Sequence, residues 1–291
     1  MRERKLGKTG FSVSEIGLGT WQVGGRWGEA FDPGLADRSI AEALDRGVDF
    51  IDTADVYSDG ESEKAVGRAL RSHPGRFRVA TKCGRQISPH VSVGYTPKVL
   101  RGYVEDSLRR LGTDCLDLIQ LHCPPTEVYY RPEIFELFDR LKAEGKVANL
   151  GVSVEKIEEG LKAIEYPNVT TVQIIFNMFR QRPAELFFRE AARRDVGVIV
   201  RVPLASGLLS GKYTRQTSFG SKDHRSYNRE GAAFDKGETF SGVEYEKGLA
   251  AVEALIERGL PVMHRQKNRL VVLEAVERWL AEPAARSPLG D

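Results

Sequence analysis

"LDLIQLHCPPTEVYYRPEIFELFDRLKAEGKVANLGVS", residues 116–153, contains a strand candidate, a helix candidate and a second strand candidate in direct succession. The strand candidates "LDLIQLH" and "VANLGVS" are short apolar runs, whereas the helix candidate "RPEIFELFDRLKAEG" is longer and amphipathic. Strands that are apolar on both faces are typical of a parallel sheet that is covered on both sides. The stretch therefore predicts one strand–helix unit and the strand of the next unit.

The same alternation continues on both sides of this stretch. Further strands are expected at residues 15–21, 48–52, 77–83, 171–177 and 196–203, and further helices at 34–47, 62–72, 96–112, 154–166 and 182–195. Thr96 and Pro97 predict the start of one helix, and Gly47 predicts the end of another. By Pro203 the chain has seven expected strands with six helices between them, which indicates an α/β fold.

Two architectures fit this alternation. A doubly wound sheet usually has a Gly-rich phosphate fingerprint after its first strand, but "GLGTW" (17–21) lacks GxGxxG and does not open a helix. An unbroken run of units without a linker favours a closed (β/α)8 TIM barrel, which we expect to span residues 1–291 as a single domain. "RKLGKTGFSVS" (4–14) predicts a β-hairpin that plugs the bottom of the barrel.

Composition and charge exclude several classes of protein. Charged residues make up 29% and apolar residues 41% of the chain, and the net charge is only +2, so neither nucleic acid nor a membrane is expected as a partner. The N-terminus is polar and no apolar run approaches the ~18 residues of a membrane span, so a cytoplasmic protein is expected. Cys83, Cys115 and Cys123 are expected to be reduced, partly buried thiols, and the histidines lack the spacing of a metal site.

Polar residues gather at the expected carboxyl ends of the strands, where a barrel places its active site. Asp52 ends the strand at 48–52, Tyr57 follows it closely, and Lys82 and His122 lie at the ends of the next two strands. An ammonium beside a phenol favours the phenolate, a carboxylate keeps the ammonium charged, and an imidazole can donate a hydrogen bond to a carbonyl oxygen. The set predicts a general acid for an oxygen that becomes negative during reduction.

Other residues near this rim have less specific interpretations. Trp21 and Trp27 are expected to wall a substrate pocket, and Arg85 either meets an anionic substrate or is a solvated charge. Asp55 is interpreted as a turn former rather than a catalyst. The Gly-, Ser- and charge-rich segment Thr214–Thr239 indicates a mobile lid. No side chain supplies a hydride, so reduction requires a reduced cofactor.

These motifs resemble those of the aldo-keto reductases, which are NADPH-dependent (β/α)8 enzymes. The resemblance rests on "DFIDTADVYSDGESE", "VATKCGR", "LDLIQLH", "LGVS" and "RVPLASGLLSGKY", in the family's order and spacing, over roughly residues 1–255. It implies a catalytic tetrad of Asp52, Tyr57, Lys82 and His122, with Tyr57 as the acid. It also implies these cofactor contacts: Gly19, Thr20, Ser153, Gln173, Arg201, Pro203, Leu204, Ser206, Gly207, Leu209, Gly211 and Lys212.

Within that set the resemblance assigns Ser153 and Gln173 to the nicotinamide carboxamide, and the loop from Leu204 to Lys212 to the cofactor pyrophosphate. Two positions nearby depart from the family's pattern. Val154 stands where Asn is common, which implies the loss of one amide contact to the cofactor. Arg201 stands where many members stack an aromatic ring on the nicotinamide, and its planar guanidinium can stack in the same way.

The segment after Leu255 is the largest departure. The family's pattern there is an eighth strand followed by a basic helix that binds the adenosine 2′-phosphate, and no such phosphate site is recognisable in this sequence. Either "GLPVMH" (259–264) is the eighth strand and "NRLVVLEAVERWLAE" (268–282) the eighth helix, or Trp279 lies in the helix before an absent strand. We expect an atypical or incomplete C-terminal unit, with a disordered or rearranged tail beyond about Ala281.

The resemblance implies an oxidoreductase that reduces a small carbonyl substrate, an aldehyde or ketone, with NADPH or with NADH. A second hypothesis is a redox-sensing or regulatory protein of the same family with weak or no turnover. A third is that the altered C-terminal segment has removed both cofactor binding and activity. The sequence leaves the physiological substrate and the oligomeric state open.

Overall fold

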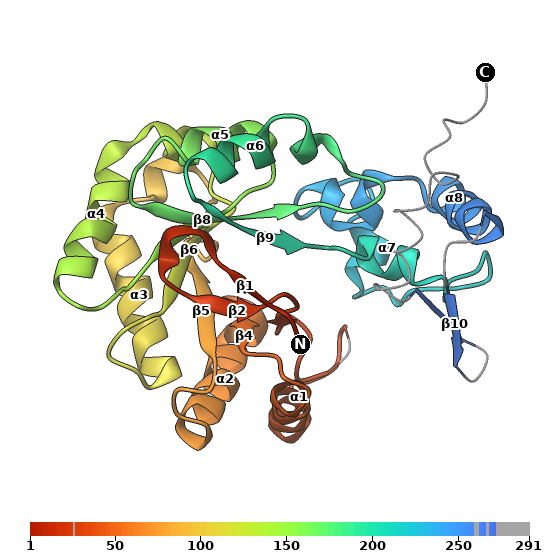
Figure 1. The fold of residues 1–291 in the computed structure, drawn as a ribbon, viewed down its shortest axis with the longest axis horizontal. Helices are drawn as coiled ribbons and strands as arrows, with labels where there is room; N and C mark the ends of the chain where they lie inside the picture. Colours follow the sequence, from red (N-terminus) through yellow and green to blue (C-terminus); the bar gives the residue numbers. More distant parts are fainter. Residues whose placement is uncertain (26, 259–261, 266–267, 272–291) are drawn as a thin grey trace. The chain divides into compact units, whose positions relative to one another are not determined.

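The computed structural model describes residues 1–25, 27–258, 262–265 and 268–271 (Figure 1). These residues form two compact units. The first contains Met1–Ile174 and Arg182–Val200, and the second contains Ile175–Gln181 and the described residues from Arg201 onward. The expected single domain over the whole chain stays a prediction.

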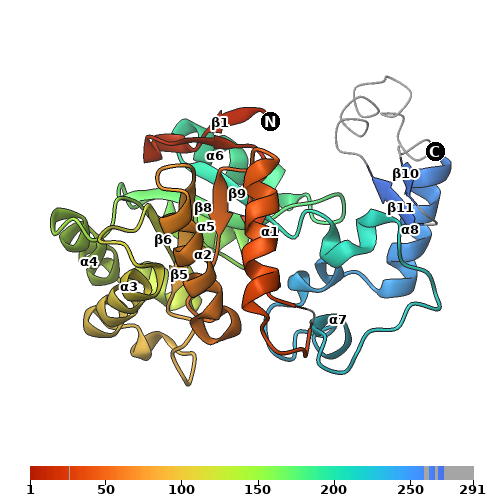
Figure 2. The same cartoon turned by 90° about the horizontal axis from the view of Figure 1, so that it is seen from below.

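A curled sheet of seven strands forms the centre of the first unit. Two residues at strand ends of this sheet, Ile175 and Arg201, belong to the second unit. Its strands, in chain order, are β3 (Leu18–Gly19), β4 (Phe50–Asp52), β5 (Arg78–Cys83), β6 (Leu118–His122), β7 (Leu150–Ser153), β8 (Val169–Ile175) and β9 (Gly197–Arg201). Strands β3 to β8 pair in parallel, each with the next, and β9 follows β8. Figure 2 shows β5, β6, β8 and β9 of this sheet from a second side. The predicted α/β fold of barrel type is confirmed.

Helices between successive strands cover the outer face of this sheet (Figure 1). They are α1 (Pro33–Asp45), α2 (Glu61–Ser72), α3 (Pro97–Leu111), α4 (Pro132–Ala143), α5 (Ile157–Ala163) and α6 (Phe187–Arg193). The main apolar core lies between these helices and the strands, and it includes Ile40 of α1, Val104 of α3 and Ile119 of β6. Every residue of β7 and β8 is buried, which explains why these strands are not amphipathic in sequence.

Local sequence sets where these helices begin and end. The Thr96 hydroxyl accepts a hydrogen bond from the backbone N–H of Val99 (3.3 Å), and Pro97 occupies the first turn of α3. Gly112 ends this helix in the left-handed conformation (φ 67°), which glycine adopts without strain. The predicted helix at 96–112 is confirmed.

The N-terminal hairpin consists of β1 (Glu3–Lys5) and β2 (Ser12–Ser14), which pair antiparallel. Its apolar residue Val13 packs with Phe50 and Leu118, which begin β4 and β6. Gly7 in the turn (φ 51°) approaches Gly197 so closely that a Cβ atom would lie 2.1 Å from the Gly197 nitrogen. The hairpin therefore covers the amino ends of the strands, as predicted for a plug.

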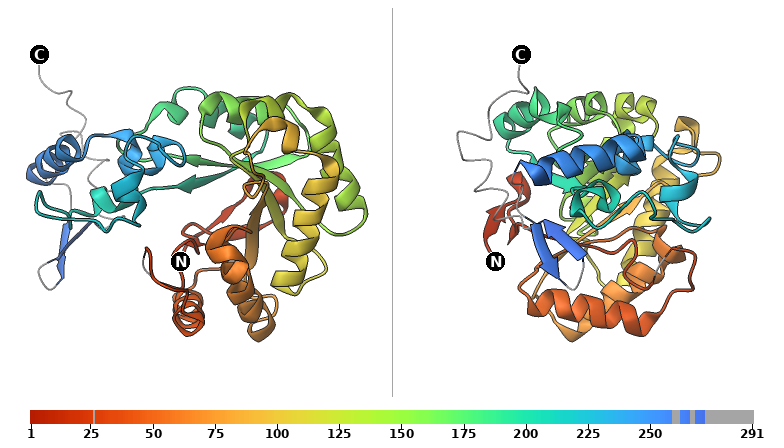
Figure 3. Two further views of the ribbon diagram at one scale, coloured as in Figure 1. Left: turned by 180° about the vertical axis from the view of Figure 1, so that it is seen from behind. Right: turned by 90° about the vertical axis from the view of Figure 1, so that its right-hand side faces the viewer.

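The second unit contains most of the chain after β9. Its helical segments are η6 (Ala205–Ser210), α7 (His224–Tyr227), η7 (Lys236–Glu238), η8 (Phe240–Gly242) and α8 (Tyr245–Glu257). Leu208, Phe240 and Leu249 belong to its apolar core. Two further strands, β10 (Val262–Arg265) and β11 (Asn268–Val271), pair antiparallel with each other as a separate hairpin (Figure 3).

This hairpin rules out one of the two alternatives for the segment after Leu255. That alternative placed an eighth strand at residues 259–264, but β10 joins β11 rather than the parallel sheet. It also placed a helix at residues 268–282, but residues 268–271 form β11. Only two residues separate β10 from β11, whereas a parallel crossover needs about a dozen. The described part of the C-terminal unit is therefore atypical, as expected, and Trp279 and the tail beyond Ala281 lie outside the described residues.

The segment Thr214–Thr239 is organised by buried polar side chains. The Asn228 Oδ1 atom accepts hydrogen bonds from the backbone N–H groups of Ala233 (2.8 Å) and Phe234 (3.0 Å). The Asn228 amide group donates to the hydroxyl of Thr239 (3.3 Å). These contacts turn the segment back on itself, and its predicted mobility as a lid stays a prediction.

No helix within the described ranges combines the length and the hydrophobicity that a membrane span requires. Within the same ranges, no group of three or more His, Cys, Asp or Glu side chains is placed to hold a metal ion. Cys83 and Cys123 are buried, as expected. Cys115 is exposed, contrary to the prediction, because it lies in the short connection between α3 and β6.

Candidate active site

The parallel register brings the predicted polar residues to one rim of the sheet. Asp52, His122 and Ser153 end β4, β6 and β7, while Lys82 and Gln173 lie near the ends of β5 and β8. His122 pairs in register with Ser153, and Ser153 pairs with Gln173. Side chains predicted from widely separated stretches of sequence therefore lie on adjacent strands.

Lys82 is the centre of this group and is fully buried. Its Nζ atom lies 2.5 Å from the Asp52 Oδ1 atom, 2.8 Å from the carbonyl oxygen of Thr53 and 3.3 Å from the Tyr57 hydroxyl oxygen. Burial disfavours the ammonium form, but the carboxylate of Asp52 and the hydroxyl of Tyr57 outweigh burial, so the pKa of Lys82 is raised above its ordinary value. Lys82 therefore stays charged although its side chain is buried.

Two amide side chains hold the other oxygen of Asp52. The Oδ2 atom accepts hydrogen bonds from Gln173 Nε2 (2.7 Å) and from Gln120 Nε2 (3.2 Å). Gln173 was predicted as a cofactor contact, but Gln120 was not recognised from the sequence. The signal for it was the alternation of β6, which places Gln120 on the same face as His122, two residues later.

Tyr57 begins the short 3₁₀ segment η2 (Tyr57–Gly60) after β4. The rings of Tyr57 and His122 meet edge to face, with centroids 5.9 Å apart and planes at 84°. Lys82 Nζ lies 4.9 Å from the centroid of the Tyr57 ring, and the indole of Trp21 stacks near it at 6.0 Å. All four residues of the predicted tetrad are therefore together, with an aromatic residue beside them.

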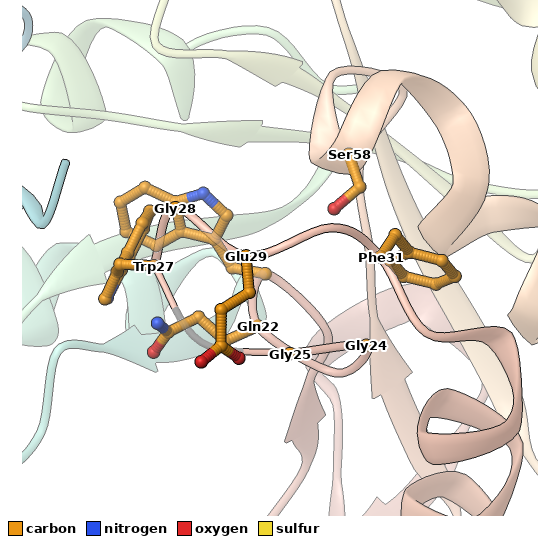
Figure 4. Close-up of a pocket in the computed structure, with 9 residues that line it drawn as sticks. Gln22, Gly24, Gly25, Trp27, Gly28, Glu29, Phe31 and Ser58 are labelled. Carbon is orange, nitrogen blue, oxygen red and sulfur yellow. The ribbon is translucent and has the colours of Figure 1, made fainter.

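The first loop after β3 surrounds a hollow of about 170 Å³ (Figure 4). Trp21 and Trp27 line it and pack edge to face, with ring centroids 4.6 Å apart, and Ser58, the residue after Tyr57, lines it too. In Figure 4, Trp27 and Phe31 lie at opposite ends, with the Glu29 side chain between them. The predicted pocket aromatics thus lie at a hollow, and what the hollow binds stays a prediction.

Arg85 is not among the residues that line this hollow. Its guanidinium donates to the carbonyl oxygen of Cys123 (3.5 Å) and lies 3.6 Å from the carboxylate of Glu155. These contacts direct Arg85 toward the loops that follow β6 and β7.

Gly19 and Thr20, predicted as cofactor contacts, lie at and just after the end of β3. Thr20 is buried, and its backbone N–H and its hydroxyl both donate to the carbonyl oxygen of Asp52 (2.9 and 3.0 Å). The Thr20 hydroxyl also accepts a hydrogen bond from Ser62 at the start of α2 (2.7 Å). The side chain of Thr20 thus supports β4, and its contact with a cofactor stays a prediction.

The predicted pyrophosphate loop lies in the second unit. Its predicted contacts are Pro203, Leu204, Ser206, Gly207, Leu209, Gly211 and Lys212, and the residues Ala205–Ser210 form η6. Backbone φ angles are positive at Val202 (54°), Ser206 (56°) and Gly207 (91°). Positive φ at a β-branched residue such as Val202 is rare, and such strain collects at binding sites.

Arg201, at the end of β9, forms an ion pair with Glu238 of η7. Both side chains are largely buried, with exposed fractions of 14% and 13%. The hydroxyl of Ser206 donates to the carbonyl oxygen of Glu238 (2.7 Å) and accepts from the backbone N–H of Phe240 (3.1 Å). The segment that ends the predicted lid therefore contacts two predicted cofactor residues, and nothing in the sequence pattern indicated this.

Comparison with known proteins assigns this chain to a family. Residues 15–280 match the Aldo/keto reductase family. The aldo-keto reductase YhdN of Bacillus subtilis is 32% identical, over 78% of this chain and 70% of the YhdN chain. The NADH-specific methylglyoxal reductase of Escherichia coli is 33% identical, over 74% of this chain and 71% of the reductase chain. A glycerol dehydrogenase structure from Gluconobacter oxydans superposes with a TM-score of 0.70 at 31% identity, over 96% of this chain and 82% of that one. The chain therefore belongs to the aldo/keto reductase family, whose members are NAD(P)H-dependent oxidoreductases.

Proposed function

We propose that this protein reduces small aldehydes or ketones to alcohols with NADPH or NADH, and that Tyr57 is the general acid. The observation that carries the proposal is the position of Lys82 Nζ, 2.5 Å from the Asp52 carboxylate and 3.3 Å from the Tyr57 hydroxyl. A buried cation in contact with a phenol is an arrangement suited to proton donation.

Each residue of the tetrad has a distinct part in the proposed reaction. The Tyr57 hydroxyl donates its proton to the carbonyl oxygen as negative charge develops there. Lys82 stabilises the phenolate that remains, because its ammonium is buried beside the Tyr57 oxygen. Asp52 keeps Lys82 charged and oriented, and Gln120 and Gln173 fix Asp52.

His122 is proposed to orient the substrate. Its ring stands edge to face against the ring of Tyr57, at a centroid distance of 5.9 Å. An imidazole N–H in that position can donate a hydrogen bond to the same carbonyl oxygen that Tyr57 protonates. Two donors to one oxygen favour the developing alkoxide over the neutral carbonyl.

The residues predicted to hold the nicotinamide carboxamide fit such a group. Gln173 is buried and its Nε2 atom is fixed by Asp52, while its Oε1 atom accepts a long hydrogen bond from Ser153 (3.4 Å). That oxygen keeps the capacity to accept from a carboxamide N–H. A reduced nicotinamide, when bound, supplies the hydride.

Separate features of the second unit support a dinucleotide. Gly207 and the positive-φ residues around it allow a pyrophosphate to approach the backbone closely. Arg201 is held by Glu238 and presents a planar cation that can stack on a flat ring.

The proposal is tested by following oxidation of NADPH and of NADH by the purified chain with methylglyoxal, glyceraldehyde and simple ketones as substrates. We expect turnover that depends on the carbonyl compound, with the alcohol identified as product by NMR. Cofactor binding without alcohol formation from any of these substrates would contradict the proposal.

A further inference from the structure

A second carboxyl group of the Asp52–Tyr57 segment is buried in the first unit and takes no part in the contacts described above. Asp55 is only 2% exposed, and neither of its carboxyl oxygens has a hydrogen-bond partner of good geometry among the described residues. Gln86 and the backbone of Val56 lie close enough to favour the charged form weakly. An ionised carboxylate in such a place is costly, so it must either be paired with a cation or hold a proton.

The charges around Asp55 do not balance a second carboxylate. Glu63 of α2 is also fully buried, and it accepts hydrogen bonds from Arg110 Nε (2.5 Å) and from the Thr81 hydroxyl (2.5 Å). The positive charge of Arg110 on α3 lowers the pKa of Asp55, but its guanidinium already donates a hydrogen bond to Glu63. Two carboxylates against one guanidinium would leave a net negative charge in the core.

Three more titratable groups interact with Asp55 in the part of the chain that the structure describes, and none of the three is a cation. They are Cys83 of β5, Tyr95 before α3 and Tyr103 on α3. Burial raises the pKa of each of them, and the negative charge of Asp55 raises it further. All three are therefore neutral at physiological pH and cannot pair with a carboxylate.

Burial is the largest influence on Asp55 itself, followed by repulsion from Glu63, and Arg110 offsets only part of these effects. Together they raise the pKa of Asp55 from 3.8 to about 7. The carboxyl group therefore keeps its proton through the acidic range and ionises near neutrality.

The backbone around Asp55 ties this group to the catalytic residues. The N–H of Asp55 donates to the carbonyl oxygen of Lys82 (3.3 Å), and the Thr53 carbonyl accepts from Lys82 Nζ (2.8 Å). The N–H of Tyr57 donates to the carbonyl oxygen of Ala54 (3.2 Å). Thr53 to Tyr57 thus form one short turn, which is hydrogen-bonded both to the backbone of Lys82 and to the side chain of Lys82.

We propose that Asp55, in its neutral form, is a positioning residue for the Tyr57 hydroxyl, and that its ionisation moves this turn out of the geometry in which Lys82 contacts Tyr57. The inference rests on the proposed reductive function of the site. An unpaired carboxylate is expected to move toward water or toward Arg110, and the turn moves with it. Asp55 thereby sets an alkaline limb of the reduction rate near neutral pH.

The experiment is a pH profile, from about pH 5 to about pH 9, of single-turnover reduction by wild type, Asp55→Asn and Asp59→Asn. Asp59 lies just after this turn, in η2, and its carboxylate is exposed, so Asp59→Asn is the matched control. Each profile is scaled to its own acidic plateau. We expect wild type and Asp59→Asn to lose activity by about tenfold per pH unit above the midpoint, and Asp55→Asn to stay flat there, since Asn cannot ionise.

An alkaline limb in Asp55→Asn that matches wild type would overturn the inference while leaving the proposed function intact. If wild type shows no turnover at any pH, both the inference about Asp55 and the proposed function are contradicted. If Asp55→Asn does not fold, carbon NMR of wild type labelled at its aspartate carboxyl groups gives the answer. One carboxyl that titrates with the midpoint of the kinetic limb supports the proposal, and titration of every aspartate below about pH 5 overturns it.

Discussion

The ammonium nitrogen of Lys82 lies 3.3 Å from the hydroxyl oxygen of Tyr57. Lys82 comes from β5 and Tyr57 from η2, so this contact exists only when the sheet and the loop after β4 are both formed. Lys82 is fully buried and its pKa is raised because Asp52 and Tyr57 outweigh the effect of burial. The pair therefore places a permanent positive charge against the proposed proton donor.

Replacement of Lys82 by methionine removes this charge while keeping an unbranched side chain. We expect Lys82→Met to slow the chemical step by about 10²- to 10⁴-fold and to change or erase its pH dependence. Lys82→Arg should recover only part of the rate, because a guanidinium differs from an ammonium in shape and hydration. Single-turnover kinetics over a range of pH measures both effects.

Lys64→Met is the matched control, because Lys64 lies on α2 and forms an exposed ion pair with Glu61. Its rate should equal that of wild type. A Lys82→Met variant with the wild-type pH profile would refute this role for Lys82.

The ion pair between Arg201 and Glu238 predicts an effect on cofactor affinity. A guanidinium stacked on an aromatic ring contributes about 1 kcal/mol, so Arg201→Ala should weaken NADPH binding by about fivefold or more. Glu238→Gln keeps the shape but removes the charge that orients Arg201, and should weaken binding in the same direction. Fluorescence titration with NADPH gives both dissociation constants, and unchanged affinity in both variants would exclude a cofactor contact by Arg201.

Burial of Asp55 predicts a pH-dependent difference in stability between wild type and Asp55→Asn. The folded pKa of about 7 lies above the ordinary value of 3.8, so only the unfolded chain ionises between these values, and wild type loses stability as pH rises through this window. The free energy of unfolding of wild type falls by about 4 kcal/mol in all. The fall is complete above about pH 7 and has not begun below about pH 4. Urea unfolding at several pH values measures the free energy of unfolding of both proteins. The value for Asp55→Asn should rise relative to that of wild type as pH increases across this window.

Asp59→Asn should show no such pH-dependent rise in the free energy of unfolding relative to wild type, because Asp59 is exposed. A stability difference between Asp55→Asn and wild type that does not vary with pH would mean that the Asp55 pKa is the same in the folded and unfolded states.

Cofactor preference follows from the residues after Leu255, where no 2′-phosphate site is recognisable in the sequence. Each charge-assisted hydrogen bond to a phosphate contributes roughly 1.5 to 3 kcal/mol, so the loss of two removes about a hundredfold or more of NADPH preference. We expect NADPH and NADH to bind with affinities within about tenfold of each other. A strong preference for NADPH would instead direct attention to Lys212, and its loss in Lys212→Met would assign the phosphate contact to that residue.

The sheet and the tetrad were predictable because their signals are local. Apolar runs of strand length alternate with amphipathic runs along the chain, and the residue that ends each strand faces the same rim in any barrel of this type. Asp52, Lys82 and His122 could therefore be placed together before any contact was known.

Other parts of the site depend on contacts between distant segments that leave no periodic signal. The burial of Asp55 depends on how α2 and α3 pack over the turn, so its sequence context alone indicated an ordinary turn residue. Glu238 reaches Arg201 only through the folding of the irregular segment before it. The sequence left a strand and a helix open as one alternative for the residues of β10 and β11, because short apolar runs fit either element.

The central claim is that the Tyr57 hydroxyl protonates the substrate, and Tyr57→Phe tests it most directly. The measurement is the single-turnover rate of carbonyl reduction at saturating cofactor, with a substrate that shows a full isotope effect from deuterated NADPH. The account predicts a fall of about 10²-fold or more, with NADPH affinity within a few fold of wild type. A variant that keeps more than about half of the wild-type rate would show that Tyr57 is not the acid.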